Sequence, residues 1–127
     1  MTEVNEIYKC NKCGNIVEIL EAGTAVVECC GEPMELLEAI QREEGTEKHI
    51  PVITVNKDNV KVEVGSTPHP MVDDHWINFI ELCVGDQIYR QRLNPGDKPC
   101  ASFNVIASNQ EVSSRIYCNV HGLWPSN

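Results

Sequence analysis

The stretch Asn59–Gly65 reads NVKVEVG and decides the fold class of the chain. Its three valines alternate with Lys61 and Glu63, which places the apolar side chains on one face of a β-strand. Five further strand-length segments are rich in Val, Ile and aromatic residues: 50–56, 76–83, 87–93, 101–107 and 113–118. Turn sequences such as NKDN and NPGDKP punctuate them, and helical periodicity is lacking. We therefore expect a mainly β chain with an antiparallel β-sandwich over residues 49–127.

Residues 1–37 differ in composition from the rest of the chain. They carry four of the seven cysteines, and their short apolar runs are separated by glycines. This pattern predicts a small domain of a few short strands joined by tight turns. The polar segment 38–48, EAIQREEGTEK, is expected to be a linker, with Glu43 and Glu44 exposed to solvent.

Charge and hydropathy limit the partners and the location of the protein. With 10 Lys and Arg against 19 Asp and Glu, the net charge of −9 argues against binding to nucleic acid or to an anionic membrane. No apolar run could span a bilayer, and the N-terminal MTEVNEIYKC lacks a signal-peptide pattern. We expect a cytoplasmic protein, in which clustered cysteines bind metal more often than they form disulfides.

Four cysteines form a first candidate metal site. Cys10 and Cys13 make a C-x-x-C motif in YKCNKCGN, a turn in which two thiolates can bind one ion. Cys29 and Cys30 are adjacent in VECCG, and a disulfide between neighbours would close a strained ring. Together they supply four sulfur ligands, a set that selects zinc or iron. The spacing leaves the choice between these two metals open.

The histidines form a second candidate site. All four lie at or near the end of a predicted strand, where loops can meet at one end of a sandwich: His49, His69, His75 and His121. Cys118 lies three positions before His121, so both can reach one ion. Imidazole with one thiolate suits a redox-capable metal or zinc.

These motifs together resemble one family. YKCNKCGNIVE, VECCGEPM, EKHIPVI, HPM, HWI and YCNVHG are similar, in order and over nearly the whole chain, to desulfoferrodoxin, the two-iron form of superoxide reductase. The resemblance implies a desulforedoxin-like N-terminal domain and an immunoglobulin-like β-sandwich. It implies an Fe(Cys)₄ centre on Cys10, Cys13, Cys29 and Cys30. It also implies a second iron with an axial Cys118 thiolate, an open sixth position in the ferrous state, and four equatorial imidazoles: His49, His69, His75 and His121.

The resemblance also implies an activity and partners. The second iron would reduce superoxide by one electron to hydrogen peroxide, without forming dioxygen, as a defence against oxygen toxicity. Lys48 would guide the anion and organise the water that supplies protons, and Glu47 would occupy the sixth position once the iron is ferric. A rubredoxin-like electron donor and a homodimer are further expectations.

Two other functions fit parts of the pattern. A pure electron carrier would use both metals without superoxide chemistry, and a zinc ribbon fused to a blue-copper domain would also combine cysteine and histidine ligands. Blue-copper sites use two histidines, one cysteine and a weak methionine, whereas this chain has four histidines and no methionine after His121.

Several residues are expected to have structural roles. Cys83 and Cys100 lie outside both constellations, so we expect free thiols that pack as small apolar side chains. Trp76 and Trp124 are expected in the core or in a pocket wall. Backbone N–H groups from Asn119 to His121 are expected to donate to the Cys118 sulfur.

Overall fold

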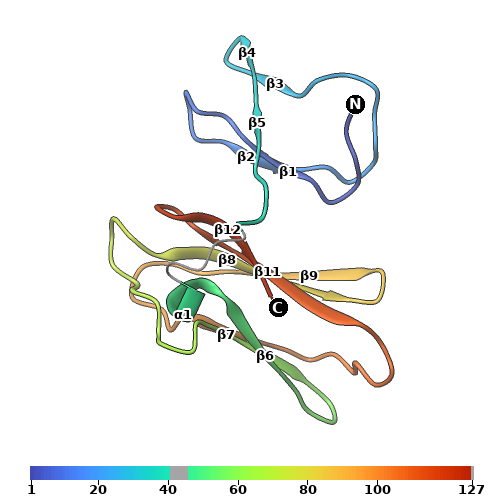
Figure 1. Ribbon diagram of the computed structural model, residues 1–127, viewed down its shortest axis with the longest axis vertical. Coiled ribbons are helices and arrows are strands. Elements are labelled where there is room, and N and C mark those ends of the chain that lie inside the picture. The colour runs from blue at the N-terminus through green and yellow to red at the C-terminus, as the bar shows by residue number, and fades with distance from the viewer. Residues whose placement is uncertain (41–45, 127) are drawn as a thin grey trace. The chain divides into compact units, whose positions relative to one another are not determined.

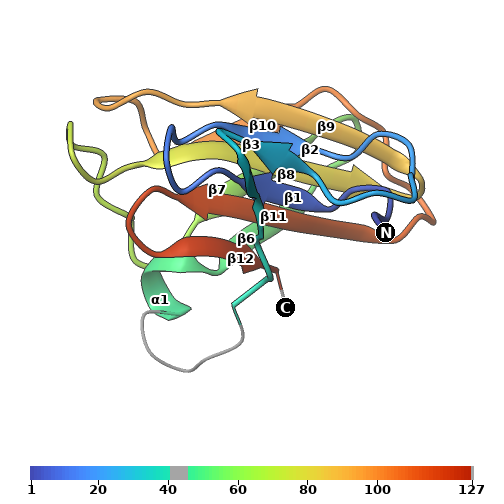
Figure 2. The same ribbon diagram turned by 90° about the horizontal axis from the view of Figure 1, so that it is seen from above.

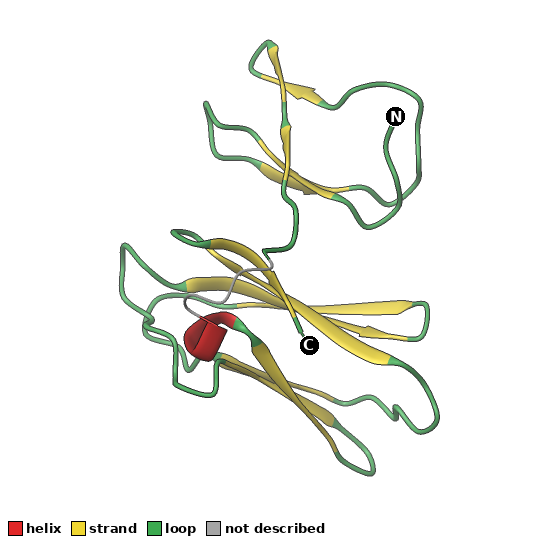
Figure 3. Cartoon of the chain, in the orientation of Figure 1, coloured by secondary structure: helices red, strands yellow, loops and turns green. Residues whose placement is uncertain are grey.

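The structure is a computed structural model that describes residues 1–40 and 46–126. It divides the chain into two compact units, Met1–Glu38 and Ala39–Asn127. Within the described residues the elements are β-strands and one four-residue helix. Figure 3 shows that strands and loops make up most of the chain. The predicted mainly β class is therefore confirmed. Residues 41–45 of the predicted linker lie outside the described residues, and these include the acidic pair Glu43 and Glu44.

The first unit is built from very short strands. β1 (Ile7–Lys9) lies between β2 (Ile16–Glu18) and β5 (Glu35–Leu36) in an antiparallel sheet. β3 (Glu28–Cys29) pairs with β4 (Glu32–Pro33) as a separate two-stranded ribbon. The predicted arrangement of short strands and tight turns is confirmed.

The second unit is a sandwich of two antiparallel sheets (Figure 1). One sheet has the order β10–β7–β6 and the other has the order β12–β11–β8–β9. The strands are β6 (Pro51–Val55), β7 (Val60–Val64), β8 (Ile77–Val84), β9 (Gln87–Arg92), β10 (Cys100–Phe103), β11 (Val112–Cys118) and β12 (Gly122–Pro125). The sandwich predicted from the alternating valines is confirmed.

The core of the second unit lies between the two sheets. Val60, Val62 and Val64 on β7 are at most 1% exposed, as the alternation with charged residues predicts. They belong to one cluster with Ile80 and Leu82 of β8, which are fully buried. Full burial of each such side chain contributes about 1.5–3 kcal/mol, so this unit has a substantial apolar core of its own.

Three features of the second unit were not predicted. β12 is too short, with a glycine and a proline, to be recognised without its partner β11. The segment 101–107 is a strand only as far as Phe103. The helix α1 (Thr46–His49) has a single turn, which is too short to show a helical period.

Helix α1 is important because it carries the end of the predicted linker and the first histidine. Figure 2 shows α1 beside β12. The ring of His49 on α1 stacks on Trp124 of β12, which confirms this proximity.

Across the described part of the chain, none of the helices has the length and apolar character needed to cross a membrane.

Candidate metal centres

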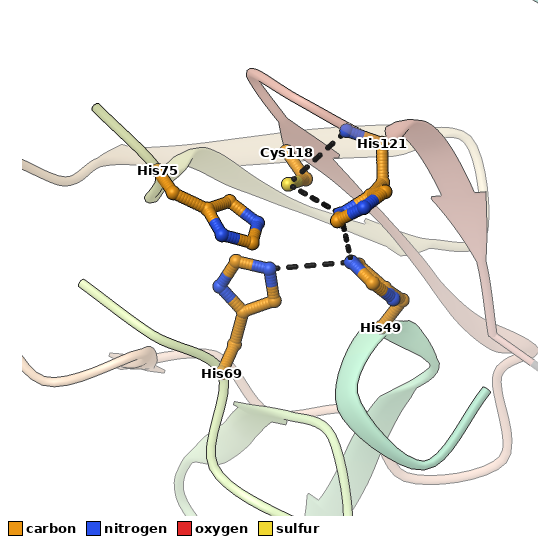
Figure 4. Close-up of side chains that lie close together, drawn as sticks. All are labelled: His49, His69, His75, Cys118 and His121. Atoms are coloured by element: carbon orange, nitrogen blue, oxygen red, sulfur yellow. Dashed lines mark hydrogen bonds between the residues drawn. The ribbon is translucent and has the colours of Figure 1, made fainter. Parts of the chain in front are cut away.

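The four histidines and Cys118 lie together at one end of the sandwich, as Figure 4 shows. His49 is on α1, His69 and His75 lie in the β7–β8 connection, Cys118 ends β11, and His121 follows in the turn before β12. Their ligand atoms all lie within 4.8 Å of one another. Residues 72 positions apart in the chain thus share one small volume.

The ring nitrogens are spaced as neighbouring ligands of one ion would be. His49 Nε2 is 3.1 Å from His121 Nδ1 and 3.2 Å from His69 Nε2. Two nitrogens bound at about 2.1 Å and at a right angle would lie about 3.0 Å apart. A neutral imidazole carries one lone pair on its ring nitrogens, so rings at this spacing can direct their lone pairs toward one shared ion.

His69 is prepared as a neutral ligand. Its Nδ1–H donates to the Pro70 carbonyl at 2.7 Å, which leaves the lone pair on Nε2 toward the other rings. Burial lowers the pKa of His69 to about 4. The uncharged form, which is the form that binds metal, is therefore favoured at neutral pH.

His75 provides the test of whether these residues fit a metal. Its Nε2 is buried and has no hydrogen-bond partner among the described residues. Leaving such an atom unsatisfied costs about 1–3 kcal/mol. A metal ion at the centre of the group would satisfy it, so the donor set fits an ion bound by nitrogen and sulfur.

Trp124 supports two of the histidines. It is fully buried, and its indole ring lies 4.5 Å from the His49 ring at an interplanar angle of 12°. Its Nε1–H donates to the His121 carbonyl at 3.1 Å. The predicted place in the core or pocket wall is confirmed, but the contacts with two histidines could not be read from the sequence.

The Cys118 sulfur is enclosed by protein. The residue is fully buried, and the backbone N–H of His121 donates to its Sγ at 3.4 Å. Burial raises the pKa of the Cys118 thiol, while backbone hydrogen bonds from His121 and Val120 oppose this rise. The expectation for Asn119 is wrong, because its N–H donates instead to the Trp76 carbonyl at 3.3 Å.

Glu47 and Lys48 are exposed on α1, directly before His49. The backbone around them is held by the turn after β7. The Glu47 carbonyl accepts hydrogen bonds from the Thr67 N–H at 2.8 Å and from the Ser66 hydroxyl at 3.3 Å. This turn fixes the backbone position of α1 and therefore the positions from which the Glu47 and Lys48 side chains extend.

Gly65 allows that turn to approach α1 closely. Its φ is +85°, and an added Cβ would lie 2.4 Å from the Thr67 carbonyl oxygen and 2.6 Å from the Glu47 carbonyl oxygen. The same atom would lie 2.7 Å from the Lys48 Cα. Sequence reasoning missed this residue, although a glycine directly after a strand is a recognisable signal.

The four N-terminal cysteines form the second group. The sulfurs of Cys10, Cys13, Cys29 and Cys30 lie within 4.8 Å of one another. Backbone N–H groups of Cys13 and Lys12 lower the pKa of Cys10 to about 6. Hydrogen bonds with the Cys13 and Cys29 thiols raise the pKa of Cys30 to about 12. Four sulfurs this close cannot all be thiolates without a cation, so the group fits a metal ion.

The adjacent cysteines reach the same ion through an uncommon backbone conformation. Cys30 has φ +54° and is followed by Gly31 with φ +76°. This left-handed turn lets the Cys29 and Cys30 sulfurs lie 3.9 Å apart on one side of the chain. The seven cysteines all lie within the described residues and are free of disulfides, which confirms Cys83 and Cys100 as free thiols.

Comparison with known proteins assigns the family. The family model described as desulfoferrodoxin matches residues 41–127, and the model of the desulfoferrodoxin N-terminal domain matches residues 2–37. The chain belongs to the desulfoferrodoxin family. It is 52% identical to a desulfoferrodoxin homolog of Methanothermobacter thermautotrophicus, with 98% of this chain and 99% of the relative covered. It is 49% identical to the desulfoferrodoxin of Nitratidesulfovibrio vulgaris, with 94% and 93% covered.

Solved structures agree with this family. The superoxide reductase of Treponema pallidum superposes with a TM-score of 0.78 at 27% identity, covering 96% of each chain. A superoxide reductase of Giardia intestinalis superposes with a TM-score of 0.55 at 31% identity, covering 63% of this chain and 95% of that one. A desulfoferrodoxin with one Cys₄ group and one His₄Cys group is compatible with two iron centres, as predicted.

Proposed function

We propose that this protein is a superoxide reductase that acts at the His₄Cys group. The observation that carries the proposal is the convergence of four imidazoles and one buried thiol within 4.8 Å. The membership in the desulfoferrodoxin family and the superposition on a superoxide reductase over 96% of the chain support it.

The proposed ligands of the catalytic iron are His49, His69, His75, His121 and Cys118, and Cys10, Cys13, Cys29 and Cys30 bind the other iron. Iron bound by this group would supply the one electron that, with two protons, converts superoxide to hydrogen peroxide. The buried position of Cys118 keeps its sulfur from solvent and from oxidants. The Pro70 carbonyl keeps the His69 proton on Nδ1, so this ring stays a neutral ligand.

Lys48 is proposed to attract the substrate. The chain has a net charge of −9, which opposes the approach of an anion. Lys48 is an exposed cation directly before His49, so it raises the local concentration of superoxide and can orient a water that supplies protons. Glu47, on the same helix, is proposed to offer its carboxylate as a further ligand of this iron in the oxidised protein.

The remaining assignments are proposals that rest on the family. We assign residues 1–37 to the Fe(Cys)₄ domain, residues 38–48 to the linker and residues 49–127 to the catalytic sandwich. The Fe(Cys)₄ centre would serve electron transport from a rubredoxin-like donor. A homodimer in the cytoplasm is the proposed state, and light scattering together with cell fractionation would test it.

The proposal is tested by mixing the pre-reduced protein with a pulse of superoxide. The expected rate constant is near the diffusion limit, about 10⁹ M⁻¹s⁻¹. Reduction yields one hydrogen peroxide for each superoxide consumed, whereas dismutation yields one for every two. A slow reaction would favour the pure electron carrier, and copper in place of iron by elemental analysis would favour the blue-copper alternative.

A further inference from the structure

The side-chain amide of Asn119 lies between the two residues that flank His75. Its Nδ2 donates to the Asp74 carbonyl at 3.0 Å, and its Oδ1 accepts from the Trp76 N–H at 2.9 Å. The Asn119 backbone N–H adds a third bond, to the Trp76 carbonyl at 3.3 Å. One backbone carbonyl and one backbone N–H thus fix which end of the amide is oxygen and which is nitrogen.

His75 depends on its backbone for its orientation. Within the described residues its ring nitrogen Nε2 has no hydrogen-bond partner. The ring makes edge contacts with His69 and His121, at centroid distances of 4.7 and 4.9 Å. Because these contacts are non-directional compared with a hydrogen bond, the position of the ring follows the position of the segment that carries it.

The other three histidines have supports of their own. The Nδ1–H of His69 donates to Pro70, and the ring of His49 stacks on Trp124. The backbone N–H of His121 donates to the Cys118 sulfur. His75 instead lies at the end of a turn in which its backbone and that of Val72 exchange hydrogen bonds of 3.0 and 3.1 Å. That turn is local, so it does not by itself place His75 relative to Cys118.

We propose that Asn119 is a positioning residue that fixes His75 with respect to Cys118. Asn119 directly follows Cys118, so its side chain joins the loop of the thiolate ligand to Trp76, which directly follows His75 and lies 43 positions before Asn119 in the chain. The inference rests on the proposed function in one respect, namely that the His₄Cys group holds iron. Removing the amide loosens His75 while leaving all five ligands in the chain.

The test compares iron retention in three full-length proteins: wild type, Asn119→Ala and the control Asn56→Ala. Asn56 also donates a side-chain hydrogen bond, to Asn59 Oδ1 at 2.7 Å, but it lies in the exposed β6–β7 turn. The ferrous proteins are mixed with a chelator, and both centres are followed by absorption. Asn119→Ala is expected to lose the His₄Cys iron about 10–100-fold faster than the control, the usual effect of losing an outer support of a ligand.

Two further readouts separate positioning from general stability. The iron–thiolate absorption band and the reduction potential of the His₄Cys centre are expected to shift in Asn119→Ala but not in Asn56→Ala. The Fe(Cys)₄ centre of the same molecule is the internal reference, and its absorption is expected to stay unchanged in both variants.

Asn119→Asp keeps the size of the side chain and provides a second variant if Asn119→Ala does not fold. It retains the acceptor for the Trp76 N–H but places an oxygen against the Asp74 carbonyl, so its iron loss is expected to be faster than in the control. If both Asn119 variants retain iron as long as Asn56→Ala, with unchanged bands, the inference is overturned. A wild-type protein that holds its iron but fails to reduce superoxide would instead overturn the proposed function and leave this comparison intact.

Discussion

The Cys₄ group of the first unit and the His₄Cys group of the second differ in what holds their ligands in place. The first unit has strands of two or three residues, and its buried apolar side chains are Ile7, Cys10 and Met34. The second unit has an apolar core between two sheets of three and four strands. A domain of fewer than about 40 residues usually needs a metal or disulfides to fold, whereas a sandwich with a full core does not. We infer that metal organises the first unit and that the sandwich organises the second metal site.

The largest expected effect comes from removing one ligand of the first group. Cys13→Ser breaks the Cys₄ set, so the absorption of that centre is expected to vanish and the first unit to lose its protection against amide hydrogen exchange. Superoxide reduction at the His₄Cys iron is expected to persist. Cys100→Ser is the matched control, because Cys100 lies outside both groups.

If the first unit keeps its exchange protection in Cys13→Ser, its short strands suffice without the metal and the inferred role of the metal is wrong. Loss of superoxide reduction along with the first centre would contradict the inferred independence of the second site. The two iron sites would then depend on each other, and the sandwich would not be sufficient to organise the second.

A smaller effect is expected from Gly65→Ala, which disturbs only the sandwich. The matched control is Gly96→Ala, where φ is +92° and an added Cβ meets nothing within 4 Å. Both variants carry the cost of a positive φ, about 1–2 kcal/mol. Gly65→Ala also forces the turn away from Glu47 and Lys48, which costs about 1–3 kcal/mol more.

Two measurements check the Gly65 prediction. Chemical unfolding is expected to show a larger loss of stability in Gly65→Ala than in Gly96→Ala, and the superoxide reaction is expected to be slower in the former alone. Equal stability and equal rates in the two variants would mean that the close approach of this turn does not position α1.

A several-fold effect is expected from Lys48→Ala. Removing this exposed cation is expected to slow the capture of superoxide and to flatten its dependence on salt, while the iron stays bound. Lys57→Ala removes the same charge from the exposed β6–β7 turn and is expected to change the rate little. If the two variants give the same rate and the same salt dependence, Lys48 has no specific part in substrate capture.

The smallest change in superoxide rate is expected from Trp124→Phe. Phenylalanine keeps an aromatic ring against His49 but removes the Nε1–H that donates to the His121 carbonyl. Absorption and potential measurements on the His₄Cys centre are expected to show a small shift, and a larger one for Trp124→Leu, which also loses the stacking. If both variants have the same spectra and potential as the wild-type protein, Trp124 is not a support of the site.

The sequence predicted the strands of the sandwich better than its connections. The alternation around Val60, Val62 and Val64 has a period of two, which only a strand with one buried face satisfies. Helix α1 depends on the turn at Gly65, which lies beyond strand β6 in the chain. Strand β12 depends on pairing with β11, the strand directly before it. Short elements of this kind carry too few residues to show a period.

The residues of the two metal groups could be named from the sequence because cysteine and histidine spacing is specific. The residues that hold these ligands in place could not be named from the sequence. Trp124 acts through a ring stack on His49, and Asn119 acts through hydrogen bonds to backbone atoms more than 40 positions away. Neither contact follows from residue type. The expectation that the Asn119 N–H binds the Cys118 sulfur was wrong because that N–H faces the Trp76 carbonyl.

The proposed division of roles between the two iron centres is tested by following both in the reduced wild-type protein after a single pulse of superoxide. The His₄Cys absorption is expected to change first and the Fe(Cys)₄ absorption only later, and one hydrogen peroxide is expected for each superoxide consumed. Oxidation of the Fe(Cys)₄ centre first, or one hydrogen peroxide for every two superoxide ions, would show that the His₄Cys centre is not the site of superoxide reduction.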